Sequence, residues 1–150
     1  MLTARFLLTR AKGKPRQADL RRAVSAAYYA VFHALCEETA DSLIGTAHPD
    51  RTERAWVQTY RAIHHAKART ACKNFVGAAS DFPVEAQQFA LIFVRLQQKR
   101  HSADYDPISR FRKEEVQAFV DGAQTAISNF KSLPRRQKSA FAALMLFQKR

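Results

Sequence analysis

The stretch RRAVSAAYYAVFHAL, residues 21–35, decides the fold of this chain. Its apolar residues recur at the spacing of one face of an α-helix, and they are Val24, Ala27, Tyr28, Val31 and Leu35. The same pattern starts before this stretch and continues after it. We therefore predict one long helix from about Ala18 to Leu43, with Gly45 as its C-cap.

The rest of the chain is also typical of a helical protein. Among its 150 residues only four are glycine and five are proline, whereas 47% are hydrophobic. A chain of this size forms one ordinary domain and can bury a core. We expect a single all-α domain over residues 1–150, an up-down bundle of four to five main helices plus short terminal helices.

Turn signals separate five further helical segments. A short helix is predicted over 2–11, before Gly13 and Pro15, and another follows the N-cap Asp50 and runs to about Phe75. The second of these carries Trp56, Tyr60, Ile63 and Cys72. Of the remaining three segments, one follows the turn GAASDFP (77–83), one begins near Lys113 and one lies beyond Pro134.

The chain is strongly basic, with 25 Lys and Arg against 13 Asp and Glu, a formal net charge of +12. The basic residues fall into four zones, 1–22, 51–73, 95–113 and 131–150. Such a balance favours an anionic partner, chiefly nucleic acid, because binding phosphates releases counterions. The alternative is a solvated basic surface that only keeps the protein soluble.

Motifs for metal and cofactor chemistry are absent from the sequence. It has no CxxC, no HExxH, no glycine-rich phosphate loop and no GxSxG. Adjacent His64 and His65 point about 100° apart on a helix, and His33 with Cys36 supplies only two ligands. We therefore expect no cofactor and no metal, and packing roles for these four residues.

The cysteines and the apolar segments predict a cytoplasmic protein. Cys36 and Cys72 are the only cysteines, both in apolar helical patterns, and no cleavable signal precedes them. The longest uncharged run, 23–36, is shorter than the roughly 18 residues of a membrane span. Membrane-surface attachment through SAFAALMLFQKR (139–150) is a weaker alternative, because its apolar residues are better explained as core or dimer contacts.

The segment RHSADYD, residues 100–106, gathers side chains that handle phosphate and protons. Arg100 offers a planar fork of donors to a phosphate, and His101 exchanges a proton near neutral pH. A structural alternative is equally concrete. Arg100 and Asp104 are four apart on a helix and can pair, while Tyr105 buries its ring and ends the segment.

Together, RRAVSAAYYAVFHAL and LQQKRHSADYD (96–106) resemble the small bacterial branch of the HEPN superfamily, over about residues 16–130. This resemblance implies an all-α bundle that forms a homodimer and binds RNA. It also implies metal-independent endoribonuclease activity of the toxin or defence type. The usual HEPN site is an arginine, often followed by a polar residue, and then a histidine four to six positions later.

In this chain Arg100 matches the motif arginine and His101 the polar residue after it, but Tyr105 stands where the histidine is expected. A phenol is a poor base at neutral pH because its proton leaves only near about pH 10. A second alignment pairs Arg95 with His101. The resemblance implies that Arg100 holds the phosphate, that His101 acts as acid or base, and that Asp104 and Tyr105 orient them.

Basic residues around this segment are the candidates for contacts with the RNA backbone: Arg95, Lys99, Arg110 and Arg112. The resemblance also leaves a second function open. The chain could be a non-catalytic HEPN module, either a dimeric scaffold or the partner of a nucleotidyltransferase-like antitoxin.

Overall fold

The computed structural model describes residues 1–9, 16–47, 49, 51–77 and 81–147. Within these ranges the chain forms seven helices and no strand, which confirms the all-α class. The helices are α1 (Leu2–Thr9), α2 (Gln17–Ile44), α3 (Glu53–Arg61), α4 (His65–Asn74), α5 (Val84–Tyr105), α6 (Lys113–Lys131) and α7 (Arg135–Leu146).

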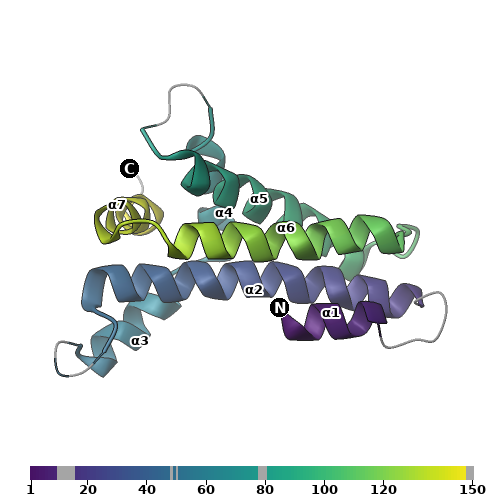
Figure 1. The fold of residues 1–150 in the computed structure, drawn as a ribbon, viewed down its shortest axis with the longest axis horizontal. Coiled ribbons are helices and arrows are strands. Elements are labelled where there is room, and N and C mark those ends of the chain that lie inside the picture. Colours follow the sequence, from purple (N-terminus) through teal and green to yellow (C-terminus); the bar gives the residue numbers. More distant parts are fainter. Residues whose placement is uncertain (10–15, 48, 50, 78–80, 148–150) are drawn as a thin grey trace.

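Helix α2 is the centre of the bundle and contacts α1, α3, α5, α6 and α7 (Figure 1). Helix α5 runs antiparallel to α2, since Ser25 near the start of α2 meets Asp104 near the end of α5. Helix α6 runs parallel to α2, because Lys131 at its end meets Glu37 near the end of α2. The long helices therefore alternate in direction along the chain, as predicted.

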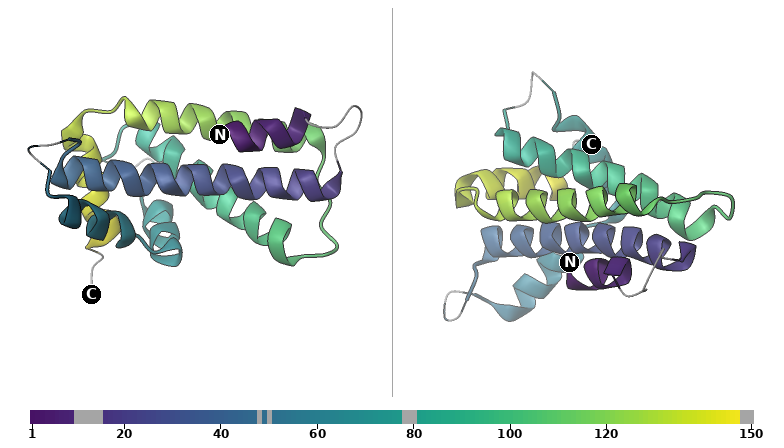
Figure 2. Two further views of the ribbon diagram at one scale, coloured as in Figure 1. Left: turned by 90° about the horizontal axis from the view of Figure 1, so that it is seen from below. Right: turned by 45° about the vertical axis from the view of Figure 1, so that its right-hand side comes forward.

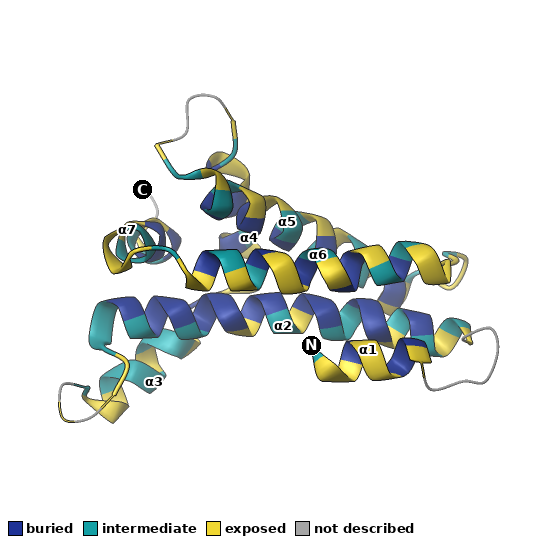
Figure 3. Cartoon of the chain, in the orientation of Figure 1, coloured by how far each residue is buried: buried dark blue, intermediate teal, exposed yellow. Residues whose placement is uncertain are grey.

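The core lies where α2, α5 and α6 face one another, and each of these helices carries many of the buried residues (Figure 3). Its largest side chains with less than 2% exposure include Tyr28, Phe89, Phe93, Phe130 and Phe141. The rings of Phe89 and Phe130 stack with centroids 4.3 Å apart. Because α2 is covered by neighbours on several sides, its apolar residues extend over more than one face.

The single helix predicted from Asp50 to about Phe75 is wrong, because the chain breaks into α3 and α4. At the break His64 has an extended backbone (φ −102°, ψ 132°), and the side chain of Ile63 is buried. Helix α3 packs on the end of α2, whereas α4 packs on α5. These two surfaces draw the segments in different directions, so tertiary packing overrides helix propensity.

The end of α2 matches the prediction. Gly45 is the C-cap, with φ 115° and its N–H donating to the Asp41 carbonyl at 3.0 Å. A positive φ of this size is a conformation that favours glycine. Three of the predicted turn residues, Gly13, Pro15 and Asp50, lie outside the described residues, and Thr52 is the N-cap of α3.

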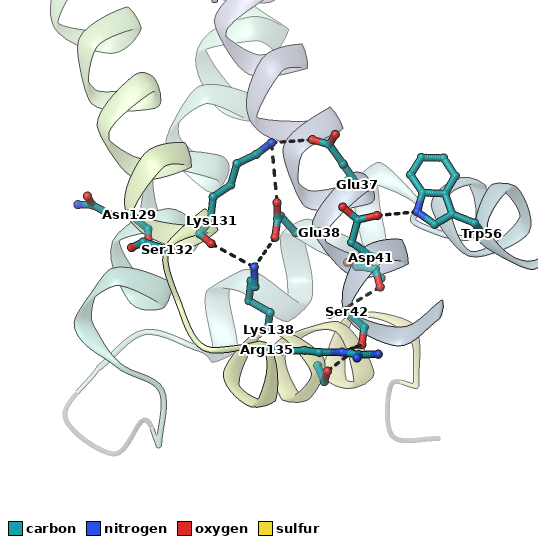
Figure 4. A network of polar contacts seen from close by, with 12 residues as sticks. Glu37, Glu38, Asp41, Ser42, Trp56, Asn129, Lys131, Ser132, Arg135 and Lys138 are labelled. Carbon is teal, nitrogen blue, oxygen red and sulfur yellow. Dashed lines mark hydrogen bonds and ion pairs between the residues drawn. The ribbon is translucent and has the colours of Figure 1, made fainter. Parts of the chain in front are cut away.

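Helix α7 is fastened to its own bundle by a polar network (Figure 4). Lys138 Nζ donates to Glu38 Oε2 at 2.8 Å and to the Lys131 carbonyl at 3.1 Å. Arg135 Nε donates to the Ser42 carbonyl at 3.1 Å. The apolar residues of α7 differ in burial, since Phe141 and Met145 are buried in the core whereas Leu144 is 48% exposed.

In the described part of the chain, no helix combines the length and apolar character needed to cross a bilayer.

Candidate nucleic-acid interface

Arg21 of α2 fixes the C-terminal end of α5, where RHSADYD lies. Its Nη1 donates to the Ala103 carbonyl at 2.8 Å, and its Nη2 to the carbonyls of Asp106 and Ser109 at 2.8 and 2.6 Å. The last carbonyls of a helix have no partner within that helix. The guanidinium therefore supplies the C-terminal cap of α5 from another helix.

The loop after α5 is held by two further sets of hydrogen bonds. The Asp106 carboxylate accepts from Ser109 Oγ at 2.5 Å and from the Ile108 N–H at 2.9 Å, and these bonds lower its pKa. Gln17 donates to the Phe111 carbonyl at 2.7 Å and accepts from the Phe111 N–H at 3.0 Å. The loop is thus tied to α2.

Within RHSADYD, Arg100 and Asp104 form the ion pair proposed as the structural alternative. Arg100 Nε lies 2.6 Å from Asp104 Oδ2, although this contact lacks the geometry of a hydrogen bond. The other carboxylate oxygen of Asp104 accepts from Ser25 Oγ at 2.6 Å, and Arg100 Nη2 donates to Tyr29 Oη at 3.0 Å. Both Arg100 and Asp104 are therefore oriented by side chains of α2.

Tyr105 does not bury its ring as expected, because 64% of the residue is exposed. Its ring lies 5.1 Å from that of exposed His101 and 5.6 Å from the Arg100 guanidinium carbon. The Arg100 carbon also lies 5.5 Å from the Tyr29 ring centroid. Arg100 thus sits between two tyrosine rings, with His101 beside one of them.

The environment of Arg100 keeps its guanidinium charged. Burial by itself would lower its pKa, but the oxygens of Tyr29 and Asp104 outweigh that effect and raise the pKa. The side chain of Arg100 remains 24% exposed. Arg100 is consequently a fixed positive charge that a bound anion can reach.

A groove of about 620 Å³ runs between α4 and α5 and includes Arg100 and His101. Its lining residues are Ala66, Arg69, Thr70, Lys73, Gln97, Gln98, Arg100, His101 and Ser102. Three of these are permanently basic and none is acidic. We call this feature the α4–α5 groove.

Arg69 and Lys73 supply the uncompensated charge of the α4–α5 groove. They are four residues apart, so they lie one helical turn from each other on α4. Neither forms an ion pair with a described acid, and the buried Arg69 Nε has no hydrogen-bond partner among the described residues. Unpaired donors beside a basic groove are suited to phosphate oxygens.

The predicted RNA-contact residues lie elsewhere. Arg95 and Lys99 both lie over the Phe119 ring of α6, at 5.1 and 5.4 Å, and Lys99 Nζ pairs with Glu115 Oε1 at 2.8 Å. Arg110 and Arg112 are exposed residues of the segment between α5 and α6. None of these four lines the α4–α5 groove. Arg95 of the second alignment therefore points to α6 and does not share the groove of His101.

Sequence reasoning missed the contribution of α4. Arg69 and Lys73 belong to the basic zone 51–73, and their i, i+4 spacing is the signal that could have found them.

His65, which is expected only to pack, also takes part in a hydrogen bond. Its Nδ1 and Tyr28 Oη share a hydrogen bond of 2.5 Å, and its ring stacks on that of Phe32 with centroids 3.7 Å apart. Burial, followed by the charge of Arg100, lowers the pKa of His65.

The cysteines behave as predicted from their apolar surroundings. Cys36 and Cys72 are buried and not disulfide-bonded. Burial raises the pKa of the Cys36 thiol to about 12 and raises that of Cys72 as well. Among the described residues no three His, Cys, Asp or Glu side chains are grouped to hold a metal ion.

Comparison with protein families, with curated proteins and with solved structures finds no match to this chain. The HEPN resemblance therefore stays a prediction from the two sequence segments.

Proposed function

We propose that this protein binds RNA and that the α4–α5 groove holds the RNA phosphates. The observation that carries the proposal is the composition of the groove, where Arg69, Lys73 and Arg100 converge without an acidic lining residue. Such a groove attracts an anionic backbone and releases its counterions.

Two further observations favour RNA as the anion. The whole chain carries a formal net charge of +12, which adds non-specific attraction for a long polyanion. The HEPN resemblance of residues 21–35 and 96–106 implies RNA as the partner. A homodimer, an antitoxin partner and a cytoplasmic location remain predictions of the same sequence reasoning.

RNA cleavage is a second candidate function, supported by the presence of Arg100 and His101 in one groove. Metal-free cleavage needs a group to take the ribose 2′-hydroxyl proton, a group to protonate the leaving oxygen, and positive charge near the phosphate. His101 could serve in proton transfer and Arg100 could supply the charge. Tyr105 lacks the basicity for the histidine role, and Asp104 offsets part of the Arg100 charge.

Binding is tested by fluorescence anisotropy with a labelled single-stranded RNA. The Arg69→Gln and Lys73→Gln variants each remove one groove charge, and each should weaken binding by at least about threefold. Arg136→Gln is the matched control, because Arg136 is an exposed arginine of α7 that does not line the groove. Equal weakening by all three variants would show that only net charge matters and would refute the groove assignment.

Cleavage is tested separately by incubating purified protein with labelled RNA in EDTA. The wild-type protein should then cut the RNA, and Arg100→Ala and His101→Ala should not. Equal cleavage by all three proteins, or none by the wild type, would refute the catalytic role. RNA binding would still be decided by the anisotropy result.

A further inference from the structure

A row of aromatic side chains leads from Arg100 across α2 to α3. Tyr29 lies against Arg100, and the ring centroids of Tyr29 and His33 are 6.3 Å apart. From His33 the row continues to Tyr60 at 6.2 Å and from Tyr60 to Trp56 at 5.3 Å. We call Tyr29, His33, Tyr60 and Trp56 the aromatic strip.

The rings in the middle of the strip lie side by side, not face to face. His33 Nδ1 and Tyr60 Oη are joined by a hydrogen bond of 2.5 Å, and the two ring planes differ by only 16°. A hydrogen bond to an imidazole nitrogen lies close to the plane of its ring. The two rings therefore form a nearly flat surface in which neither covers the face of the other.

The strip has solvent-accessible parts and a cavity along it. Tyr29 is 38% exposed, His33 is exposed, and Tyr60 and Trp56 are half-buried. Trp56, Tyr60 and His33 also line a pocket of about 380 Å³. Met1, just before α1, and Ile127 and Lys131 of α6 complete this pocket, where Glu37 of α2 pairs with Lys131. This pocket is large enough to admit a flat ring against aromatic walls.

The aromatic strip begins beside the α4–α5 groove at Tyr29 and ends at a pocket that Met1 and α6 help to line. Helices α3 and α4 and the C-terminal half of α5 lie on the same side of α2, opposite α1 and α6 (Figure 2, left). Arg100 belongs to both features, because it lines the groove and contacts Tyr29. A ligand held by phosphates in the groove can thus continue onto the strip.

We infer that the aromatic strip binds unpaired bases of the RNA whose phosphates lie in the α4–α5 groove. The inference rests on the proposed function and adds a second contact surface to it. Unpaired bases stack on aromatic side chains whatever their sequence, and this stacking accompanies a basic groove in proteins that bind single strands. In a duplex the base faces cover one another, so a duplex gains only the phosphate contacts.

The strip also fastens α3 to α2, since Trp56 Nε1 donates to Asp41 Oδ1 at 2.7 Å and Tyr60 bonds to His33. This structural role accounts for the position of Trp56. One face of its ring is covered by the Arg51 guanidinium, whose carbon lies 4.3 Å from the ring centroid. The structural role does not require exposed rings on α2. The exposure of Tyr29 and His33 beside a basic groove is what points to a base-binding role.

The single tryptophan of the chain gives a direct readout, because Trp56 belongs to the strip. The protein is titrated with a single-stranded RNA of about 12 nucleotides, with the same sequence as a duplex, and with inorganic polyphosphate. The single strand should quench Trp56 emission as bases stack near it. Polyphosphate should bind without quenching, and the duplex should bind more weakly than the single strand.

Substitutions separate the strip from the groove. His33→Ala should weaken single-strand binding by about fivefold or more and leave polyphosphate binding unchanged. Tyr60→Phe keeps the ring and should bind the single strand within about twofold of wild type. Phe6→Ala removes a 60% exposed aromatic residue on α1 and should have no effect. Thermal melting of each variant checks that it is folded.

The inference is overturned if single-stranded RNA leaves Trp56 emission unchanged, or if His33→Ala binds the single strand as tightly as wild type. The groove proposal survives that result when Arg69→Gln still weakens binding of RNA and polyphosphate. If no RNA binds, or if Arg69→Gln and Lys73→Gln bind RNA like the wild type, the proposed function itself fails and this inference fails with it.

Discussion

The Arg100 guanidinium of α5 is paired with the carboxylate of Asp104, one helical turn further on, at 2.6 Å between Nε and Oδ2. Tyr29 and Ser25 of α2 hold the two partners in place. The arginine of the RHSADYD segment therefore faces the α4–α5 groove with part of its charge offset by its own helix. Any RNA phosphate that binds there competes with Asp104.

Removing this competitor should strengthen RNA binding. We predict that Asp104→Asn binds single-stranded RNA about threefold to tenfold more tightly than wild type, because a negative charge beside the groove is lost. The variant should also lose about 0.5–1 kcal/mol of stability with the ion pair. Asp121→Asn is the control, since Asp121 pairs with Arg5 at 3.1 Å, away from the groove. Anisotropy showing equal affinities for both variants would contradict the prediction.

The cap that Arg21 gives to α5 should be worth more than a surface contact. Arg21→Ala leaves the carbonyls of Ala103, Asp106 and Ser109 without this donor, so we expect a loss of about 2–3 kcal/mol in urea unfolding. Arg21→Lys should recover less than half of it, because an ammonium cannot reproduce the guanidinium fork. Full recovery by lysine would mean that charge alone matters.

The attachment of α7 depends on a nearly buried carboxylate. The Glu38 side chain is 9% exposed and pairs with Lys138, while Lys131 lies further away at 3.8 Å. We predict that Lys138→Met destabilises the protein by about 2–3 kcal/mol, since it leaves Glu38 poorly compensated. Adding Glu38→Met should recover most of the loss. A double variant no more stable than the single one would refute this account of the network.

Stability should fall in mild acid through His65. Its pKa is lowered by burial and by Arg100 of α5, while Tyr28 of α2 bonds to it and His33 and His64 lie nearby. Between this lowered pKa and the ordinary value of about 6.5, the unfolded chain binds more protons than the folded one. The stabilisation is complete above about pH 6.5 and decreases as the pH falls below it.

Melting temperatures measured from about pH 7.5 to about pH 5.5 test this dependence. The wild type should lose more thermal stability over that range than His65→Gln, because the other four of the five histidines are common to both proteins. An identical loss in the two proteins would show that His65 does not contribute.

Most of the helices could be predicted because their signals are local. The apolar spacing of 21–35, the C-cap Gly45 and the separator Pro134 all act within a few residues. The break between α3 and α4 could not be predicted in this way. No proline or glycine stands at 62–64, and the chain turns there because α3 packs on α2 whereas α4 packs on α5.

The candidate site likewise combines residues that the sequence predicts with residues that only the packing of the helices brings together. Arg100, His101 and Asp104 could be found because they are neighbours in the sequence, and the Arg100 and Asp104 pair follows from helical spacing. Arg69 and Lys73 join them only because α4 packs against α5. The exposure of Tyr105 also depends on packing, because 64% of this residue stays exposed where the local pattern implies a buried ring.

The salt dependence of RNA binding tests the central claim most directly, because it counts the phosphates that the α4–α5 groove holds. The affinity for a single-stranded RNA is measured between about 50 and about 200 mM salt for wild type and for the Arg69→Gln, Lys73→Gln double variant. Losing two phosphate contacts should make the slope of log K against log salt shallower by about 1.4, at about 0.7 per contact. Arg136→Gln should keep the wild-type slope. A double variant with the slope and affinity of the wild type would contradict the assignment of this groove to RNA.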